Sequence, residues 1–405
     1  MPSNEGMPEE PDVLTRLDAL IAQGARPEAL TLIDQLTQAD PSPRMACECA
    51  MLLMDMDEAA RAVRLLAPFR QEGHGGARLM TLLGRAQLAS GASEAAIHTL
   101  REATYIDGQS IEALIALGEA QIASDALPDA IATLERALRI DRDATGAHFK
   151  LGEAWALLDE TAKAIRAYEA ALATDPGDAR GAALRLAEMK ATAAPRRASS
   201  AYVRHLFDGY APRYDAHMTG ALSYRGPQIL AALAEPFWGE PAAKYEAMDL
   251  GCGTGLSGAV FRPWCRRLMG VDLSPRMVAA AEASGHYDDV QVSELVSALA
   301  TREDDLDLAI ACDTIIYLGD LASLFQALQR ALKSGGWFLF SAEKMDASMP
   351  GDYEIGPTRR FRHARAYLES LARDFGFSVS ALEDTSLRTE KRLAVPAFAG
   401  LFRKL

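Results

Sequence analysis

Small and apolar residues recur along the first half of the chain at a step of 34 positions. The recurring sets are Leu83-Gly84, Leu117-Gly118 and Leu151-Gly152; Ala86, Ala120 and Ala154; Ala96-Ile97, Ala130-Ile131 and Ala164-Ile165; and Leu100, Leu134 and Tyr168. Glycine and alanine allow two helices to cross closely, whereas leucine, isoleucine and tyrosine fill the seam between them. The pattern therefore predicts a stack of helix pairs with one pair in each unit.

This step is the spacing of the tetratricopeptide repeat (TPR). One such repeat cannot bury its apolar face alone, so several must stack. Weaker matches lie upstream, at residues 29–41 and 62–66, and residues 178–191 are typical of a capping helix. A generic helical bundle is the alternative, but a step kept at so many positions argues against coincidence. We expect an N-terminal α-solenoid of TPR type over residues 1–192, acting as a partner-binding, dimerising or stabilising module.

The second half of the chain alternates short apolar runs with helix-compatible stretches, after a polar break at residues 193–200. The apolar runs are residues 247–250, 268–271, 290–292, 306–312, 337–341, 377–380 and 398–402. Strands that alternate with helices favour a mostly parallel sheet with helices on both faces and ligands at the carboxyl ends of the strands. We expect residues 193–200 to be a linker and residues 201–405 to form a Rossmann-like α/β domain with a seven-stranded sheet.

A glycine-rich turn follows the first apolar run, and Asp249 stands two residues before its first glycine. Glycine-rich turns by themselves serve dinucleotides, phosphates and simple chain reversals alike. A carboxylate at Asp249 would repel the pyrophosphate of NAD, but it would hold the cationic amino acid end of S-adenosylmethionine. Glycines let the backbone approach such a ligand without a Cβ in the way. The residues predicted to bind this cofactor at the turn are Asp249, Gly251, Cys252, Gly253 and Gly255.

Further acidic residues follow the next predicted strands. Asp272 is placed to accept hydrogen bonds from both ribose hydroxyls of an adenosine, and Glu294 to accept one from the adenine amino group. Asp313, after the fourth apolar run, is a third candidate, with the alternative that it only caps the next helix. The apolar residues expected beside these acids in the cofactor site are Leu273, Met277 and Leu295.

These motifs make residues 199–405 similar to the class I S-adenosylmethionine-dependent methyltransferases. The whole chain resembles the bacterial TPR-containing methyltransferases, which share Phe207-Asp208-Gly209-Tyr210-Ala211-Pro212-Arg213-Tyr214-Asp215 and Arg360-Phe361-Arg362-His363. The resemblance implies that the first stretch folds over the cofactor, with Tyr210 closest. One departure is that Glu294 follows Ser293, where relatives more often show Gly and then Asp. The resemblance leaves the methyl acceptor open.

A histidine in the second shared stretch, His363, is the candidate catalytic residue. It stands among arginines, and a histidine with a pKa near neutral could remove a proton from the acceptor. The arginines could bind a carboxylate or phosphate on that acceptor, because a guanidinium group matches either. The alternative is a solvated, basic helix start. The arginines are Arg359, Arg360, Arg362 and Arg365.

Charge and composition narrow the choice of partners. The chain has a net charge of −14, with 18 Lys and Arg against 30 Asp and Glu in residues 1–192, so a nucleic acid would be repelled. Residues 313–317 also lack the paired prolines of enzymes that methylate DNA bases. No apolar run of about 18 residues occurs and residues 1–11 are polar, so we expect no membrane partner and a cytoplasmic location. Scattered cysteines predict reduced thiols and no metal site.

The leading functional hypothesis is methyl transfer from S-adenosylmethionine to a small molecule or a protein side chain, by direct in-line displacement. The protein would mainly align the acceptor atom with the methyl carbon. Two alternatives belong to other classes of protein. An NAD-dependent dehydrogenase is disfavoured by Asp249, whereas an interaction scaffold with a cofactor-binding but inactive methyltransferase fold stays open.

Overall fold

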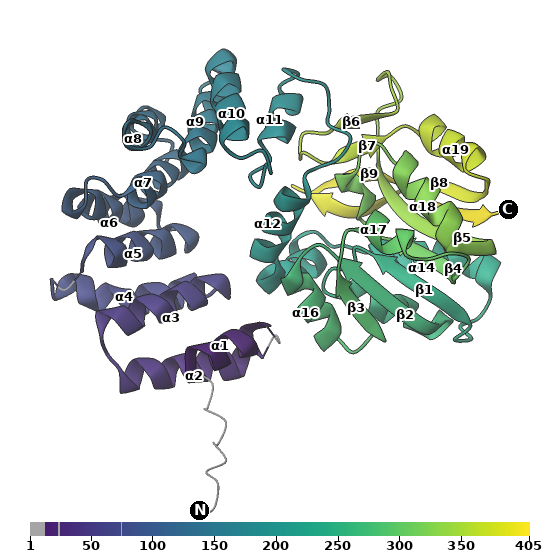
Figure 1. Ribbon diagram of the computed structural model, residues 1–405, viewed down its shortest axis with the longest axis horizontal. Coiled ribbons are helices and arrows are strands. Elements are labelled where there is room, and N and C mark those ends of the chain that lie inside the picture. Colours follow the sequence, from purple (N-terminus) through teal and green to yellow (C-terminus); the bar gives the residue numbers. More distant parts are fainter. Residues whose placement is uncertain (1–12, 23–24, 74) are drawn as a thin grey trace, which may run out of the picture. The chain divides into compact units, whose positions relative to one another are not determined.

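The structure, a computed structural model, describes residues 13–22, 25–73 and 75–405 (Figure 1). Residues 1–12, with which the predicted array begins, lie outside the described residues. The chain divides into two compact units, residues 1–108 and 109–405, and each is described by itself. Within the described ranges, no helix is long and apolar enough to cross a bilayer.

The first unit consists of helices joined by short turns. Its described helices are α1 (Val13–Ala22), α2 (Arg26–Ala39), α3 (Pro43–Asp55), α4 (Ala59–Gln71), α5 (Ala77–Ala89) and α6 (Ser93–Ile106). Their apolar faces bury one continuous core, to which Leu17, Ile33, Leu53, Leu66 and Leu83 belong. Because each helix pair contributes to the core of the next, the unit is stabilised by stacking rather than by any single pair.

The turns inside the helix pairs repeat the predicted step. Asp57, Gly91, Asp125 and Asp159 stand 34 residues apart, and their φ angles of 60°, 85°, 60° and 57° all lie in the left-handed region. Glycine adopts this conformation without strain, and aspartate adopts it more readily than most residues do. The same turn at Asp57 extends the repeat upstream to α3 and α4, where the side-chain pattern is weak. The helical repeat is confirmed, and its assignment to the TPR type stays a prediction.

The second unit opens with helices that keep the repeat. They are α7 (Ile111–Ala123), α8 (Leu127–Ile140), α9 (Thr145–Leu157), α10 (Thr161–Thr174) and α11 (Ala182–Glu188). A Cβ at Gly118 would lie 2.7 Å from Cγ of Leu134, and a Cβ at Gly152 would lie 2.7 Å from Cε1 of Tyr168. The leucine or tyrosine of one helix therefore packs directly on the glycine of its partner, as the pattern predicted. Helix α11 lies within the predicted capping segment.

The predicted linker is bound to the sheet domain. The Ala198 N–H donates to the Tyr317 carbonyl at 2.9 Å, and the N–H groups of Gly319 and Asp320 donate to the Arg196 carbonyl at 2.9 and 2.8 Å. The Arg196 side chain also forms an ion pair with Asp320. The compact units divide after Gly108 rather than at residues 193–200. The domain boundary at 193–200 therefore stays a prediction, and this segment is not a free tether.

A mostly parallel sheet forms the rest of the second unit. Its strands are β1 (Tyr245–Leu250), β2 (Cys265–Asp272), β3 (Asp289–Val292), β4 (Leu306–Ala311), β5 (Leu332–Lys344), β6 (Tyr353–Ile355), β7 (Phe361–His363), β8 (Phe377–Glu390) and β9 (Leu393–Lys404). The order is β3-β2-β1-β4-β5-β7-β6, and β9 pairs antiparallel with both β5 and β8. All pairs among β1 to β5 are parallel, which confirms the predicted class of sheet.

The sheet has nine strands, so the prediction of seven was wrong. The additional strands are β6 and β7, which pair antiparallel with each other. Strand β7 also adds in parallel to the last residues of β5, at Glu343 and Lys344. Each additional strand is three residues long, which is too short for an apolar alternation to be recognised.

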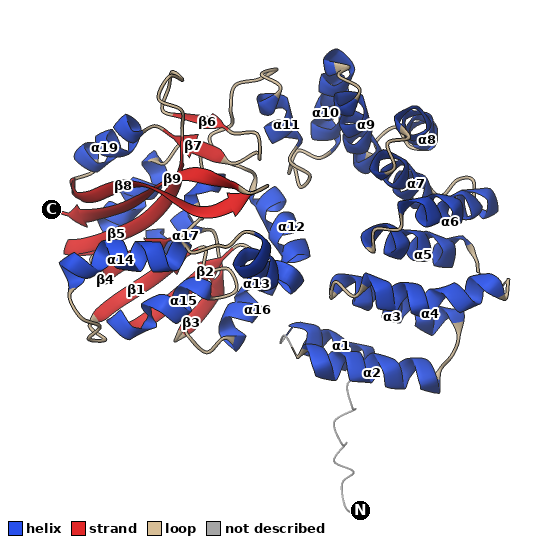
Figure 2. Cartoon of the chain, turned by 180° about the vertical axis from the view of Figure 1, so that it is seen from behind, coloured by secondary structure: helices blue, strands red, loops and turns tan. Residues whose placement is uncertain are grey.

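Helices cover both faces of the sheet (Figure 2). The covering helices are α14 (Gly226–Trp238), α15 (Leu256–Phe261), α17 (Leu295–Ala300), α18 (Ala322–Ala331) and α19 (Arg365–Asp374). Successive residues of β5 point to opposite faces, so Phe338 and Phe340 pack in the core with α17, α18 and α19. Leu339 packs in the core with α14 and α15. The sheet is thus buried on both sides, as is usual for parallel strands.

Candidate functional site

A cavity that is partly open to solvent lies at the carboxyl ends of β1, β2 and β4. Residues that follow these strands line it, together with residues of the preceding segment that begins at Arg197. The lining residues are Arg197, Ala198, Ser200, Val203, Phe207, Tyr214, Gly251, Gly253, Val271, Asp272, Leu273, Ser293, Glu294, Leu295, Cys312, Asp313, Thr314, Tyr317 and Leu318. The cavity therefore stands where ligands bind in open α/β sheets.

The three glycines of the turn have different physical roles. All three have left-handed φ angles, of 76° at Gly251, 54° at Gly253 and 102° at Gly255. A Cβ at Gly251 would lie 2.5 Å from Cγ2 of Thr314, and one at Gly255 would lie 2.9 Å from Oγ of Ser284. A Cβ at Gly253 would meet no atom closer than 4.0 Å. Gly253 thus keeps open a space beside the backbone, whereas Gly255 permits close packing and does not line the cavity.

Asp272 is the last residue of β2, and its carboxylate is fixed by the backbone on two sides. Its Oδ2 accepts a hydrogen bond from the Gly253 N–H at 3.1 Å, and its Oδ1 accepts one from the Ser274 N–H at 2.9 Å. Burial raises the pKa of Asp272, and these backbone donors oppose the rise. Each oxygen keeps further lone-pair capacity, so a pair of vicinal hydroxyls matches this side chain. The turn and the carboxylate fit an adenosine ribose.

Asp249 lies behind the turn rather than in the cavity. Its side chain is only 1% exposed, and its Oδ2 accepts a hydrogen bond from the Tyr287 hydroxyl at 2.7 Å. Its Oδ1 has no hydrogen-bond partner among the described residues. Burial raises the pKa of Asp249 to about 7, although the Tyr287 hydrogen bond opposes this. The expectation that Asp249 contacts the amino acid end of the cofactor therefore finds no support in the geometry.

Two other predicted cofactor residues are also packed away from the cavity. Cys252 is buried, and its Sγ lies 3.0 Å from the position that a Cβ on Gly270 would take. Met277 is fully buried on α16 (Pro275–Ala283). Burial in a close-packed core explains both positions, because neither side chain has a free face toward a ligand.

Three further predicted residues do line the cavity. Glu294 caps α17 by accepting a hydrogen bond from the Ser297 N–H at 2.9 Å, and it stands 3.6 Å from Arg197. Leu273 and Leu295, which follow Asp272 and Glu294 directly, add apolar surface. The structure thus brings the predicted ribose and adenine contacts together.

The shared stretch at residues 207–215 forms the end of α12 (Ser200–Tyr210), a short turn of helix (Ala211–Arg213) and the start of α13 (Tyr214–Ala216). Phe207 and Tyr214 line the cavity, but Tyr210 does not. The Tyr210 hydroxyl instead forms a hydrogen bond with Nδ1 of His217. Phe207 and Tyr214 are therefore the residues of this stretch that border the site, whereas Tyr210, which was expected to lie closest, does not line it.

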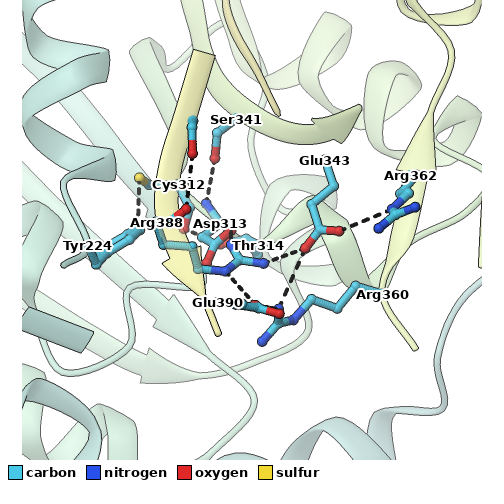
Figure 3. Close-up of polar contacts among 11 residues, drawn as sticks. Tyr224, Cys312, Asp313, Thr314, Ser341, Glu343, Arg360, Arg362, Arg388 and Glu390 are labelled. Atoms are coloured by element: carbon cyan, nitrogen blue, oxygen red, sulfur yellow. Dashed lines mark hydrogen bonds and ion pairs between the residues drawn. The ribbon is translucent and has the colours of Figure 1, made fainter. Parts of the chain in front are cut away.

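Asp313 lies at the edge of a buried ion-pair network (Figure 3). Its Oδ1 is 2.5 Å from Nη1 of Arg388, and its own N–H donates to Oγ of Ser341 at 2.8 Å. Arg388 also forms ion pairs with Glu343 and Glu390. Burial raises the pKa of Glu343, and the neighbouring Arg388 opposes that rise. The network holds the Asp313 carboxylate in one orientation at the wall of the cavity.

His363 lies in β7 and is fully buried, outside the cavity lining. Its Nε2 stands 3.1 Å from the Gly319 carbonyl oxygen, to which a protonated Nε2 donates. The ring stacks on Tyr367 with the centroids 6.2 Å apart. Burial lowers the pKa of His363 to about 4. The geometry therefore does not support a role as acceptor base, and the alternative of a solvated helix start is wrong.

Three of the four arginines around His363 are paired with carboxylates. Arg360 forms ion pairs with Glu390 and Glu343, Arg362 stands 3.6 Å from Glu343, and Arg365 stands 3.0 Å from Asp384.

Several residues that line the cavity were not predicted from the sequence, chiefly Val203, Cys312, Thr314 and Tyr317. The only signal for them was proximity in sequence to Asp313 or to the shared stretch.

The chain matches the family model for the methyltransferase domain over residues 248–340. It is 30% identical over 108 residues to 18S rRNA (guanine(1575)-N(7))-methyltransferase from Saccharomyces cerevisiae, covering 23% of this chain and 38% of that protein. It is 26% identical over 184 residues to a probable S-adenosylmethionine-dependent methyltransferase from Mycolicibacterium smegmatis, and this match covers 42% of this chain and 70% of that protein. The chain thus spans well under half the length of the first of these relatives.

A solved structure with a similar region is Burkholderia thailandensis 1,6-didemethyltoxoflavin-N1-methyltransferase with bound S-adenosylhomocysteine. The identity is 20%, the TM-score is 0.41, and the match covers 53% of this chain and 93% of that one. The family match, together with the sheet and the cavity, identifies a methyltransferase domain of the S-adenosylmethionine-dependent class in the second unit. The cofactor prediction, S-adenosylmethionine, is confirmed for this domain. The prediction that excludes nucleic acid finds no support, because one relative is named for an rRNA guanine.

Proposed function

We propose that the second unit binds S-adenosylmethionine in this cavity and catalyses methyl transfer to a small molecule or a protein side chain. The observation that carries the proposal is the Asp272 carboxylate, fixed between the N–H groups of Gly253 and Ser274 and exposed to the cavity. Beside it, Gly253 leaves the space that a Cβ would fill. A ribose matches these features, whereas a pyrophosphate would face the lining carboxylates.

Bound S-adenosylmethionine supplies a methyl group on a sulfonium, which is already a good leaving group. The residues of the chain therefore have to bind, orient and exclude water. Asp272 would accept hydrogen bonds from the ribose hydroxyls, Leu273 and Leu295 would contact the adenine, and Gly251 and Gly253 would let the backbone approach the ligand. Holding two reactants in line in this way supplies about 7 to 11 kcal/mol of the barrier.

In this proposal, the helical array is a module that binds a partner, dimerises or stabilises the chain. Its net negative charge, carried by 30 acidic against 18 basic residues in residues 1–192, favours a partner with a basic surface. Raising the salt concentration should weaken such an association.

Isothermal titration of the full chain with S-adenosylmethionine, S-adenosylhomocysteine and NAD tests the cofactor assignment. We expect the first two to bind and NAD not to bind. Binding of NAD alone would refute the proposal and favour a dehydrogenase. Transfer of a labelled methyl group to a metabolite or protein extract then separates an enzyme from a cofactor-binding scaffold, which would bind the cofactor and label nothing.

A further inference from the structure

The cavity continues beyond the proposed cofactor contacts toward the end of β4, and aromatic side chains line it there. Phe207 and Tyr317 have ring centroids 5.4 Å apart, and Phe207 and Tyr214 have centroids 6.3 Å apart. All three line the cavity, as does Asp313. Aromatic faces carry partial negative charge, so this wall favours planar or cationic groups and disfavours anions.

The strand order assigns this end of the cavity to the acceptor, provided that the proposed function holds. The order is β3-β2-β1-β4-β5; the proposed adenine contact, Glu294, follows β3, and the proposed ribose contact, Asp272, ends β2. With the adenine and ribose held there, the lining residues after β1 and β4 would be left for the rest of the cofactor and for the acceptor. Asp313 and the aromatic wall follow β4 and would therefore face the acceptor.

Among the described residues that line the cavity, none is an unpaired cation that could bind an anionic acceptor. The lining contains one arginine, Arg197, against the three carboxylates Asp272, Glu294 and Asp313. Arg197 lies 3.6 Å from Glu294. The nearby Arg388 and Arg360 are already paired with Asp313, Glu343 and Glu390 (Figure 3). An anionic acceptor would lose its hydration without gaining an unpaired cation, which is unfavourable.

Asp313 offers a fixed acceptor for a hydrogen bond. Its backbone has a left-handed φ of 57°, its N–H donates to Ser341, and its Oδ1 is held by Arg388. Among the described residues, its Oδ2 has no hydrogen-bond donor. A substrate N–H or O–H at this end of the cavity can therefore donate to Oδ2 without displacing any contact of the protein.

We propose that Asp313 and the aromatic residues Phe207, Tyr214 and Tyr317 form the acceptor site, and that this site takes a small planar molecule, uncharged or cationic, with a nucleophilic N–H or O–H. The acceptor's lone pair forms the new bond to the methyl carbon as the methyl–sulfur bond breaks. The proton from the acceptor passes to Oδ2 of Asp313, and the sulfur leaves as a neutral thioether. Asp313 thus moves from a predicted cofactor contact to a catalytic residue on the acceptor side.

Three probes that share one ring test the charge preference. The full chain, saturated with S-adenosylhomocysteine, is titrated with 2-naphthylmethylamine, 2-naphthol and 2-naphthoate, which are a cation, a neutral hydroxyl compound and an anion at neutral pH. We expect the amine and the naphthol to bind at least about 10-fold more tightly than the naphthoate. Tightest binding by the naphthoate, or binding by none of the three, overturns the proposal.

The same titrations on variants test the residues. Asp313→Asn should weaken the amine and the naphthol by about 10-fold or more, since it removes a charged acceptor, and should not weaken the naphthoate. Asp346→Asn, at an exposed position outside the cavity, is the matched control. Unchanged affinities in Asp313→Asn overturn the role of Asp313. If that variant does not fold, Phe207→Leu replaces it, and loss of affinity for all three probes is then the expected result.

Failure of the proposed function would be seen at an earlier step. If the wild-type chain does not bind S-adenosylhomocysteine, the cofactor assignment itself is wrong. If it binds S-adenosylhomocysteine but prefers the naphthoate, the cofactor assignment stands and only the acceptor site is refuted.

Discussion

Asp272 gives the sharpest test of how the cofactor is placed. Asp272→Ala removes both carboxylate oxygens, which accept from the Gly253 and Ser274 N–H groups at 3.1 and 2.9 Å and are left with capacity for two ribose hydroxyls. Hydrogen bonds to a charged group contribute about 1.5 to 3 kcal/mol, so the affinity for S-adenosylmethionine should fall by roughly 10- to 150-fold. The loss should be larger if the freed turn at Gly253 also moves.

Isothermal titration measures this loss, and thermal unfolding checks that each variant is folded. Asp272→Asn is the informative second variant, because it keeps the side-chain volume but points an amide N–H₂ at one of the two backbone donors. Asp289→Ala, at the start of β3 and outside the cavity lining, is the control and should bind as the wild type does. Wild-type affinity in a folded Asp272→Ala variant would refute the assignment of the ribose to this residue.

Three further predictions follow from the structure. Gly253→Val should abolish cofactor binding in titrations. It should lower the free energy of unfolding of the apo protein by only about 1 to 2 kcal/mol, the strain of a left-handed φ, because a Cβ at this position meets no atom closer than 4.0 Å. A variant that still binds the cofactor would make the loop a plain turn. Burial raises the pKa of Asp249 from about 4 to about 7, so the folded state binds this proton more tightly than the unfolded state, and the free energy of unfolding of the wild type should fall as the pH rises through that interval. Denaturant unfolding should show a smaller fall for Asp249→Asn, and equal falls in the two proteins would contradict the reasoning. A fragment of residues 109–405 should bind the cofactor with the affinity of the full chain. A fragment of residues 201–405 should bind it more weakly, because Arg197, Ala198 and Ser200 line the cavity. Equal affinities of the two fragments in titration would show that the segment before residue 201 is dispensable.

The fold was predictable wherever an apolar pattern is long enough to have a period. All seven predicted runs are strands, and the 34-residue step returns in helix crossings and turns. The pair β6 and β7 was not predictable, because each has three residues and includes charged side chains. Strand β5 begins at Leu332 and passes through Gly335-Gly336, whereas the predicted apolar run begins only at residue 337.

The site was predictable as a set of acids and glycines at strand ends, but their directions were not. Asp249 is the last residue but one of β1 and meets Tyr287, which is 38 residues away in sequence. Asp272 ends β2 and meets the backbone of the turn. Asp249 is buried and Asp272 is half-buried, and both are acids next to a glycine-rich segment, so composition could not distinguish a packed acid from a ligand contact. The difference comes from which tertiary neighbour each carboxylate reaches.

The partners of the arginines near His363 could not be predicted from the sequence either, and they determine the charge of the site. Their positive run in sequence suggested a surface for an anion, but folding brings Glu343, Glu390 and Asp384 against them and cancels their field. Among the described lining residues, three carboxylates then stand against one arginine, Arg197. S-adenosylmethionine carries a net positive charge through its sulfonium, whereas the demethylated product does not. An acid-rich cavity therefore stabilises the charged cofactor more than the neutral product, and the same carboxylates that disfavour an anionic acceptor favour release of the product after each transfer.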